Sequence, residues 1–213
     1  MRHVASYREF GYPDANPAYT APYLWPVVRT LSGRVGPDMR VLDVGCGNGY
    51  YAGQFLALGC TVVGIDLSAQ GIEQARRAYP AARFELLAAD DELLDRLDEA
   101  PFDLVVSTEV IEHLYDPRSF TRGCYVALRP GGRFVCSTPY HGWLKNVAIA
   151  VGGGFDRHVT ALWDGGHIKF WSRRTLFALL AEAGFERPRF AGAGRIPYLW
   201  KSMVVAAERP LDT

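Results

Sequence analysis

Two carboxylates and an imidazole in the segment Glu109-Val-Ile-Glu-His113 have the clearest capacity for chemistry. Positions i, i+3 and i+4 share one face of a helix, so Glu109, Glu112 and His113 are expected to point the same way. Such a set of oxygen and nitrogen donors suits a divalent cation. His167, which follows two glycines, is the candidate for a fourth ligand. A cation held by these four residues would lower the pKa of a substrate hydroxyl and orient its oxygen.

The same residues allow two interpretations without a metal. His113 could act alone as a general base, because an imidazole titrates near neutral pH. Alternatively, Glu112 and His113 could form a hydrogen-bonded pair that only shapes the start of a helix. We therefore take Glu112, His113 and His167 as the catalytic candidates and keep all three interpretations open.

A glycine-rich turn forms a second candidate site. The run Val41-Leu-Asp-Val-Gly-Cys-Gly-Asn-Gly places Gly45, Gly47 and Gly49 between a predicted strand and a predicted helix. Glycines let the backbone approach a ligand closely and adopt dihedral angles closed to other residues. The spacing departs from the G-x-G-x-x-G of dinucleotide-binding folds. The run also lacks the Lys or Arg that a pyrophosphate would favour, so it indicates an adenosine compound without phosphates.

An acidic residue follows where a ribose-binding group is expected. Asp66 ends the second predicted strand, 23 residues after Asp43. A carboxylate at this place can accept hydrogen bonds from two ribose hydroxyls. Its alternative role would be to cap the next helix, but Ser68 already offers that cap. Asp66 is therefore predicted to bind a ribose.

These residues lie in a regular alternation of strands and helices. Apolar, β-branched runs predict strands at 40–44, 61–65, 83–87, 102–107, 133–137, 185–190 and 202–207. Helical patterns and end signals predict helices at 22–31, 51–58, 68–79, 91–97, 109–114, 117–128 and 173–184. The alternation predicts an α/β fold with a doubly wound, seven-stranded, mostly parallel sheet. Ligands of such sheets bind at the carboxyl ends of the strands, where both candidate sites fall.

Two aromatic segments stand outside this alternation. Residues 1–35 are predicted to form a helical and aromatic cap ahead of a single domain at 36–213. Residues 138–171 are predicted to be a long, glycine-rich loop that acts as a lid. Aromatic side chains there could enclose an apolar or aromatic substrate, or simply pack as a cover. Among the aromatic residues that lie outside the predicted strand core are Tyr7, Phe10, Tyr12, Tyr19, Tyr140, Trp143, Trp163, Trp171, Tyr198 and Trp200.

Composition excludes several classes of protein. The chain has 213 residues, of which 49% are hydrophobic and 22% are charged, as in one ordinary globular domain. Lys+Arg and Asp+Glu number 23 each, so the chain lacks the basic character of a dedicated nucleic-acid binder. No run approaches the roughly 20 apolar residues of a membrane helix. Residues 1–12 lack the apolar run of a secretory signal, and the four cysteines form no Cys-x-x-Cys pair, so we expect a cytoplasmic protein with free thiols.

Several separated motifs resemble the class I S-adenosylmethionine-dependent methyltransferases. They are the glycine turn, Asp66, Asp90, the strand Phe102-Asp-Leu-Val-Val and the turn Leu128-Arg-Pro-Gly-Gly. The resemblance extends from about residue 38 to the last residue, and it is strongest to the ubiquinone-biosynthesis O-methyltransferase group and its small-molecule relatives. It implies a Rossmann-like sheet with an antiparallel last strand. It also implies S-adenosylmethionine as methyl donor and S-adenosylhomocysteine as product.

The resemblance further implies which residues hold this cofactor. Asp43 and Gly45 would lie near the methionine part, Asp66 at the ribose, and Ala89 and Asp90 at the adenine. The Glu-x-x-Glu-His pattern with a later histidine also resembles metal-assisted O-methyltransferases that act on quinone precursors or on small RNA. The full set of expected cofactor-binding residues is Asp43, Gly45, Cys46, Gly47, Gly49, Asp66, Leu67, Ala89, Asp90 and Glu109.

The expected activity is methyl transfer from S-adenosylmethionine to a small hydroxylated or aromatic acceptor, with a divalent cation as an optional second cofactor. Methylation of RNA at the 2′ oxygen is the first alternative, and the zero net charge disfavours it. A non-catalytic module that binds adenosine compounds is the second. The intact Asp43, glycine turn and Asp66 argue against that module. The oligomeric state is left open.

Overall fold

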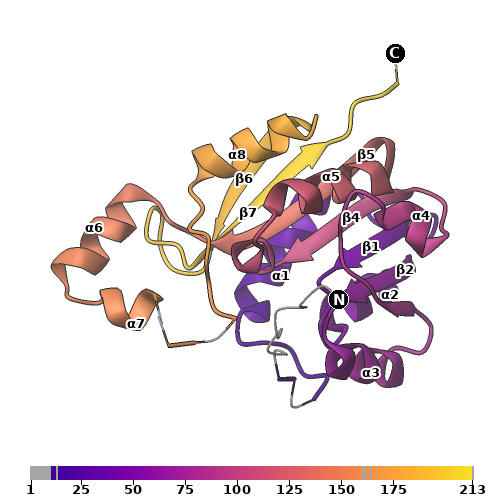
Figure 1. The fold of residues 1–213 in the computed structure, drawn as a ribbon, viewed down its shortest axis with the longest axis horizontal. Helices are drawn as coiled ribbons and strands as arrows, with labels where there is room; N and C mark the ends of the chain where they lie inside the picture. The colour runs from indigo at the N-terminus through magenta and orange to yellow at the C-terminus, as the bar shows by residue number, and fades with distance from the viewer. Residues whose placement is uncertain (1–10, 13, 160–161, 164, 213) are drawn as a thin grey trace, which may run out of the picture.

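The computed structural model of the protein describes residues 11–12, 14–159, 162–163 and 165–212. Its centre is a seven-stranded sheet with the order β3-β2-β1-β4-β5-β7-β6 (Figure 1). The strands are β1 (Arg40–Val44), β2 (Thr61–Asp66), β3 (Arg83–Leu86), β4 (Phe102–Thr108), β5 (Leu128–Pro139), β6 (Glu186–Ala193) and β7 (Ser202–Glu208). The helices are α1 (Ala21–Ser32), α2 (Tyr50–Leu56), α3 (Ala69–Ala78), α4 (Leu93–Leu97), α5 (Pro117–Ala127), α6 (Trp143–Val151), α7 (Phe155–Val159) and α8 (Arg173–Glu182), with a 3-10 turn η1 (Ile111–His113).

The predicted seven-stranded, mostly parallel α/β sheet is confirmed. Strands β1 to β5 pair in parallel, and β7 lies antiparallel between β5 and β6. The chain leaves β1 towards one edge of the sheet and returns at β4 beside β1, so these two strands form the topological switch point. Ligands of open α/β sheets bind at such a point. The glycine turn follows β1 and Glu109 follows β4, which places both at this crevice.

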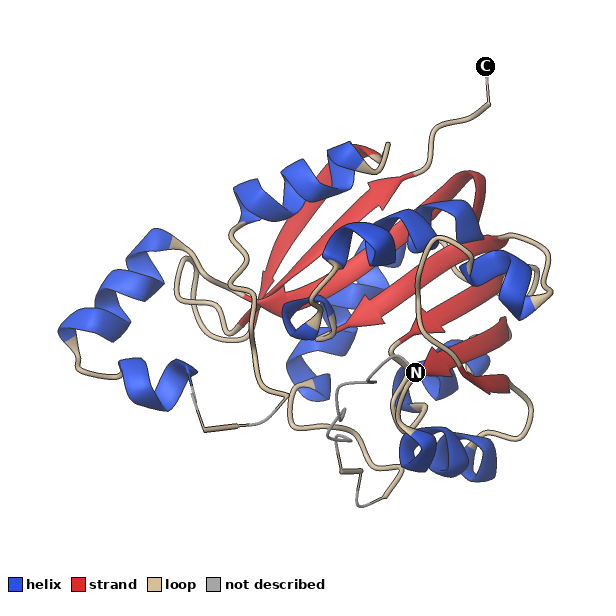
Figure 2. Cartoon of the chain, viewed as in Figure 1, coloured by secondary structure: helices blue, strands red, loops and turns tan. Residues whose placement is uncertain are grey.

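Helices cover both faces of the sheet and bury two separate cores (Figure 2). One core packs side chains of α4, α5 and α8 against the sheet, and the other packs those of α1, α2 and α3. Successive side chains of a strand point to opposite faces. In β4, accordingly, Leu104 and Val106 belong to one core and Val105 to the other. This double burial explains why the central strands are continuous apolar runs.

The segment 138–171 differs from the predicted loop because it contains two helices. Helix α6 runs through an apolar stretch with no glycine or proline, between Gly142 and Gly152, and α7 follows it. Both helices project from the sheet beyond the end of β5 (Figure 1). Gly142 and Gly152 therefore mark the two ends of α6.

The helix predicted at 109–114 is wrong. Glu109 has a left-handed φ of 55°, and only the 3-10 turn η1 follows it. Leu114 is already extended, and the Asp116 side chain caps α5 by accepting hydrogen bonds from the amides of Arg118 and Ser119. A regular helix does not fit between the end of β4 and this cap.

The described part of the amino-terminal segment lies against the glycine turn. The Asn48 side-chain amide donates to the carbonyl oxygens of Asp14 and Asn16, both at 2.9 Å. The Gln70 side chain donates to the Tyr12 carbonyl oxygen at 3.0 Å. The predicted cap residues Tyr7 and Phe10 lie outside the described residues. None of the described helices is long and apolar enough to cross a membrane.

Candidate active site

The glycine turn between β1 and α2 contains left-handed backbone and is closely packed. The φ angles are 75° at Gly45 and 51° at Gly47, a region that residues with a Cβ rarely adopt. A Cβ at Gly45 would also overlap the Val110 side chain, and one at Gly47 would overlap the Tyr12 ring. The turn therefore lies between the end of β4 on one side and the amino-terminal segment on the other.

Asp66 fixes the turn from the end of the neighbouring strand. Its Oδ2 accepts a hydrogen bond from the Gly47 amide at 2.8 Å, and its Oδ1 accepts one from the Ser68 amide at 2.7 Å. Ser68, as predicted, caps α3 by accepting from the Gly71 amide at 3.0 Å. A carboxylate oxygen can accept more than one hydrogen bond, so these two contacts are compatible with a further donor at Asp66. Leu67 beside it is 52% exposed and offers an apolar surface at the same edge.

Asp43 is fully buried beneath the turn. Neither of its carboxylate oxygens has a hydrogen-bond partner among the residues that the structure describes. Burial, together with the charge of Asp66, raises the pKa of Asp43 to about 7. A buried carboxylate without partners is costly, so a positively charged donor bound at the turn would stabilise it.

The remaining cofactor candidates lie along the same edge of the sheet. The Asp90 carboxylate accepts a hydrogen bond from the Glu92 amide at 3.1 Å and pairs with Arg96 at 2.5 Å. Ala89 packs against the core that α4 and α5 cover. Cys46 is buried within the turn, and burial raises the pKa of its thiol well above the usual value. The structure thus brings the residues after β1, β2 and β3 to one edge of the sheet.

Glu109 is held by two serines from two other strands. Its Oε1 accepts a hydrogen bond from the Ser137 hydroxyl at 2.9 Å, and its Oε2 accepts one from the Ser202 hydroxyl at 3.2 Å. Burial still raises the pKa of Glu109 to about 7. Its left-handed φ directs the side chain towards β5 and β7, beside the Val110 wall of the glycine turn.

Glu112, His113 and His167 converge on one point. The Nε2 atoms of His113 and His167 lie 4.0 and 3.9 Å from Glu112 Oε1, and the two rings are 4.9 Å apart. His113 Nδ1 lies 2.8 Å from the carbonyl oxygen of Gly165, so Nδ1 carries the proton and donates it. In the neutral ring this leaves the Nε2 lone pair facing Glu112, as in histidines that bind metals.

The electrostatics of this cluster favour a bound cation. Glu112 is 1% exposed, and neither of its oxygens has a hydrogen-bond partner within the described part of the chain. Burial, then the charge of Glu109, raises the pKa of Glu112 well above its usual value. Burial lowers the pKa of His167 to about 4, so this imidazole is neutral at pH 7. A buried carboxylate facing two imidazole lone pairs is a ligand set that a divalent cation fits.

Glu109 does not belong to this converging set, although four ligands were predicted. The potential ligand atoms of Glu112, His113 and His167 all lie within 4.8 Å of one another, and Glu109 is not part of that group. The predicted common helix face does not exist, because Glu109 precedes a 3-10 turn and bonds to Ser137 and Ser202 instead. The structure therefore gathers three of the four predicted ligands.

The position of His167 depends on backbone contacts with η1. The amides of Ile168 and Lys169 donate to the Glu112 carbonyl oxygen at 2.9 and 3.0 Å. The Trp163 ring lies 5.7 Å from the ring of His113 and 5.5 Å from that of His167. The insertion between β5 and α8 thus supplies both His167, a candidate ligand, and part of the wall around the cluster.

Sequence reasoning missed several residues of the site. Lys145 is only 6% exposed, and its Nζ donates to the Lys201 carbonyl oxygen at 3.2 Å. Burial lowers the pKa of Lys145 to about 8. The feature of the sequence that could have indicated it is a single lysine within the otherwise mostly apolar helix α6. Ser137 and Ser202 carried no signal, because a serine in a strand gives no indication of its partner.

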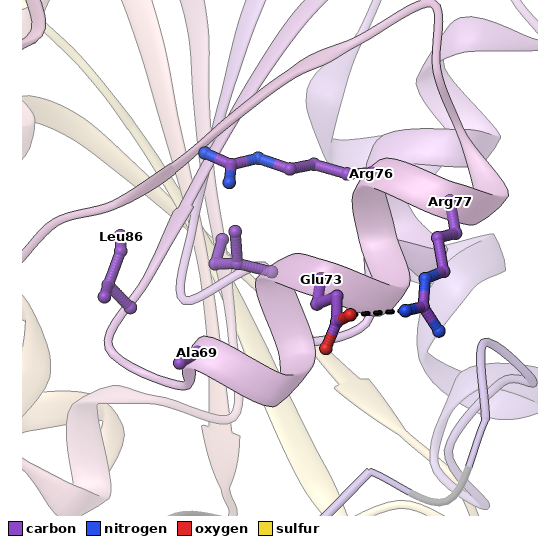
Figure 3. A pocket seen from close by; sticks show the side chains of 6 residues that line it. Ala69, Glu73, Arg76, Arg77 and Leu86 are labelled. Atoms are coloured by element: carbon purple, nitrogen blue, oxygen red, sulfur yellow. Dashed lines mark hydrogen bonds and ion pairs between the residues drawn. The ribbon is translucent and has the colours of Figure 1, made fainter.

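A separate hollow of about 310 Å³ lies on the outer side of α3 and β3 (Figure 3). Arg76, Arg77 and Glu73 of α3 border it, and Glu73 pairs with Arg77 within the helix. None of the predicted site residues lines this hollow. It is distinct from the crevice between β1 and β4.

Comparison with known proteins agrees with this arrangement. A family model described as a methyltransferase domain matches residues 19–187. The ubiquinone biosynthesis O-methyltransferase of Thiobacillus denitrificans is 32% identical over 157 residues, which cover 72% of this chain and 67% of that protein. The corresponding protein of Ruegeria pomeroyi is 34% identical over 169 residues, covering 76% and 66%. Across the first curated relatives, the chain spans about half to two thirds of their length.

A solved structure shares the fold over most of both chains. It is an S-adenosylmethionine-dependent methyltransferase from Mesorhizobium loti, superposed with a TM-score of 0.65 at 25% identity. The superposition covers 87% of this chain and 97% of that one.

Proposed function

The chain belongs to the S-adenosylmethionine-dependent methyltransferase family, and we propose that it methylates a hydroxyl oxygen of a small aromatic acceptor with the help of a divalent cation. One observation carries the proposal. Glu112, His113 and His167 converge in an arrangement that could hold a cation, close in sequence to Val110, which forms a wall of the glycine turn. The curated relatives, named as O-methyltransferases of ubiquinone biosynthesis, support the choice of oxygen and of a ring-bearing acceptor.

In this proposal the cofactor lies across the carboxyl ends of β1, β2 and β3. Asp66 accepts from the ribose hydroxyls, while Leu67, Ala89 and Asp90 surround the adenine. The methionine part follows the glycine turn, where its ammonium group offsets the buried charge of Asp43. The sulfonium then lies towards Val110 and the end of β4.

The acceptor hydroxyl is placed at the cluster of Glu112, His113 and His167. When bound there, a divalent cation supplies a positive charge that lowers the pKa of the hydroxyl. The chain's own residues orient the acceptor oxygen and exclude water, with Trp163 beside both imidazoles. Methyl transfer from a sulfonium needs little more, because proximity and alignment supply most of the rate enhancement.

The test is transfer of a labelled methyl group from S-adenosylmethionine to catechol, with product mass as the second readout. We expect activity that a chelator removes and Mg²⁺ or Mn²⁺ restores. Glu112→Gln should abolish this recovery, whereas Glu73→Gln, a matched change on exposed α3, should leave it unchanged. Activity that is insensitive to chelator but falls in His113→Ala would contradict the cation and indicate that His113 acts as a general base.

The two other functions make different predictions in the same assay. A non-catalytic module would bind S-adenosylhomocysteine yet methylate no acceptor from a metabolite extract. An RNA methyltransferase would label small RNA, and the balance of 23 basic and 23 acidic residues disfavours it.

A further inference from the structure

Lys145 is a buried cation whose hydrogen-bonding capacity is mostly unused. An ammonium group has three donors and is almost never buried unless it is paired. Lys145 is 6% exposed, and the Lys201 carbonyl oxygen is its one hydrogen-bond acceptor within the described residues. No carboxylate of the described chain lies within 4.0 Å of its Nζ, so it has no ion-pair partner there. Two donors are therefore available for a ligand.

A chain of contacts places Lys145 near the site of methyl transfer. Its Nζ bonds to the carbonyl oxygen of Lys201, and the next residue, Ser202, holds Glu109 Oε2 at 3.2 Å. Glu109 precedes Val110, which forms one wall of the glycine turn. Lys145 thus belongs to the region where the glycine turn, β5 and β7 meet.

The surroundings of Lys145 favour a negatively charged ligand. Arg195 lies near enough for its charge to lower the pKa of Lys145, after the larger effect of burial. Arg195 itself is exposed and forms no ion pair with the described residues. Glu109 is the neighbouring carboxylate, and its own raised pKa of about 7 reduces its average charge at neutral pH. The positive charges of Lys145 and Arg195 are therefore only partly balanced by the neighbouring carboxylate of Glu109.

We propose that Lys145 determines specificity by binding a carboxylate carried on the aromatic acceptor. This inference rests on the proposed function and narrows its substrate class to hydroxylated aromatic acids. Lys145 lies in α6, within the insertion that also carries His167, and the residues expected to bind the cofactor come from β1 to β4 and the loops after them. The insertion thus supplies contacts to both ends of the acceptor, the hydroxyl and the carboxylate.

The experiment compares matched acceptors on matched variants. 3,4-Dihydroxybenzoate and catechol differ only in the carboxylate. Benzoate, which has the carboxylate but no hydroxyl, and phenol, which has one hydroxyl but no carboxylate, serve as binding probes without the hydroxyl pair. Lys145→Met removes the charge and retains the length, Lys145→Arg retains the charge, and Arg174→Met removes an exposed cation of α8 as the control. Affinity for S-adenosylhomocysteine and thermal unfolding check that each variant is folded.

We expect Lys145→Met to raise KM for 3,4-dihydroxybenzoate by about 10- to 100-fold, the effect of a lost charge-assisted hydrogen bond. KM for catechol should change less than about twofold, and Lys145→Arg should recover part of the loss. Calorimetric binding of benzoate in the presence of S-adenosylhomocysteine should depend on Lys145 in the same way. Arg174→Met should change neither the KM values nor the binding of benzoate.

Three outcomes would overturn the inference. Equal effects on 3,4-dihydroxybenzoate and catechol would show that Lys145 only supports the fold. Weaker binding of S-adenosylhomocysteine with an unchanged ratio of the two KM values would assign Lys145 to the cofactor's own carboxylate. Benzoate binding that does not depend on Lys145 would also overturn it. Lys145-dependent benzoate binding without methyl transfer to either diphenol would instead reject the proposed reaction and retain the carboxylate site.

Discussion

The Nδ1–H of His113 donates a hydrogen bond to the carbonyl oxygen of Gly165, 2.8 Å away, and so ties η1 to the insertion that follows β5. The contact has two effects. It fixes the tautomer that exposes the Nε2 lone pair to Glu112, and it anchors the backbone just before His167. His113 therefore also positions His167.

The first prediction separates these two effects. His113→Ala should increase hydrogen exchange at residues 165–169, because it removes the anchor while the two bonds to the Glu112 carbonyl oxygen remain. His113→Asn should restore some protection, since its amide nitrogen can donate to Gly165, yet it should not restore activity. Equal exchange in His113→Ala and wild type would show that the anchor contributes nothing to local stability.

The second prediction concerns protons released when a cation binds. Burial and the charge of Glu109 raise the pKa of Glu112 well above its usual value, and any proton that this carboxylate holds must leave before it can bind a metal. We expect protons to be released when Mn²⁺ binds, so that affinity rises with pH. His167 contributes none, because its pKa of about 4 leaves it neutral at pH 7. Calorimetry in buffers of different ionisation enthalpy measures the number, and zero would contradict a protonated Glu112.

The third prediction uses the buried Asp43. Its folded pKa of about 7 exceeds the ordinary 3.8, so the folded protein retains a proton that the unfolded chain has lost. The free energy of unfolding of the cofactor-free protein should therefore fall as the pH rises through about 7. Asp43→Asn removes this titration, and its stability relative to wild type should increase by about 1–3 kcal/mol between pH 5 and pH 8.

The same variant supplies its own control. Denaturant unfolding at the two pH values measures the stability, and calorimetry with S-adenosylhomocysteine measures binding. We expect Asp43→Asn to bind the cofactor product more weakly even where it is more stable. A stability difference that is constant with pH would show that Asp43 is ionised in the folded state throughout this range.

The fourth prediction assigns Asp66 to the ribose. Asp66→Ala should weaken binding of S-adenosylhomocysteine by about 2–4 kcal/mol, since hydrogen bonds to charged groups contribute about 1.5–3 kcal/mol each. Part of this loss reflects the glycine turn, because Asp66 also holds the Gly47 amide. Binding of 2′,3′-dideoxyadenosine separates the two effects, because it lacks the hydroxyls but still contacts the turn. Unchanged affinity for S-adenosylhomocysteine would remove Asp66 from the site.

Local patterns predicted the features that local physics determines. The strand before Gly45 and the cap at Ser68 follow from hydrophobic runs and short-range hydrogen bonding, and the structure has both. The seven strands and their mostly parallel arrangement follow from the alternation with helices. Asp66 was placed correctly at the end of β2, because the chain leaves each parallel strand at the same edge of the sheet.

The contacts that could not be predicted join segments far apart in sequence. The left-handed φ of Glu109 is stabilised by hydroxyls of Ser137 and Ser202, and no pattern near Glu109 encodes either partner. The burial of Lys145 depends on β7, which lies more than 50 positions later. The placement of Tyr12 over Gly47 likewise needs the tertiary fold, since an aromatic residue in an irregular segment has no preferred partner.

The antiparallel insertion of β7 between β5 and β6 has a consequence during synthesis. Ser202, which holds Glu109 Oε2, follows it by 93 positions. At about 5–20 residues per second, the ribosome needs roughly 5–20 seconds to cover that distance. From the completion of β5 until β7 is made, β5 has no neighbour on its β7 side, and the carboxylate of Glu109 has the Ser137 hydroxyl without that of Ser202. Strands β1 to β5 are therefore made first, and the end of β4 gains its last serine contact only when β7 joins the sheet.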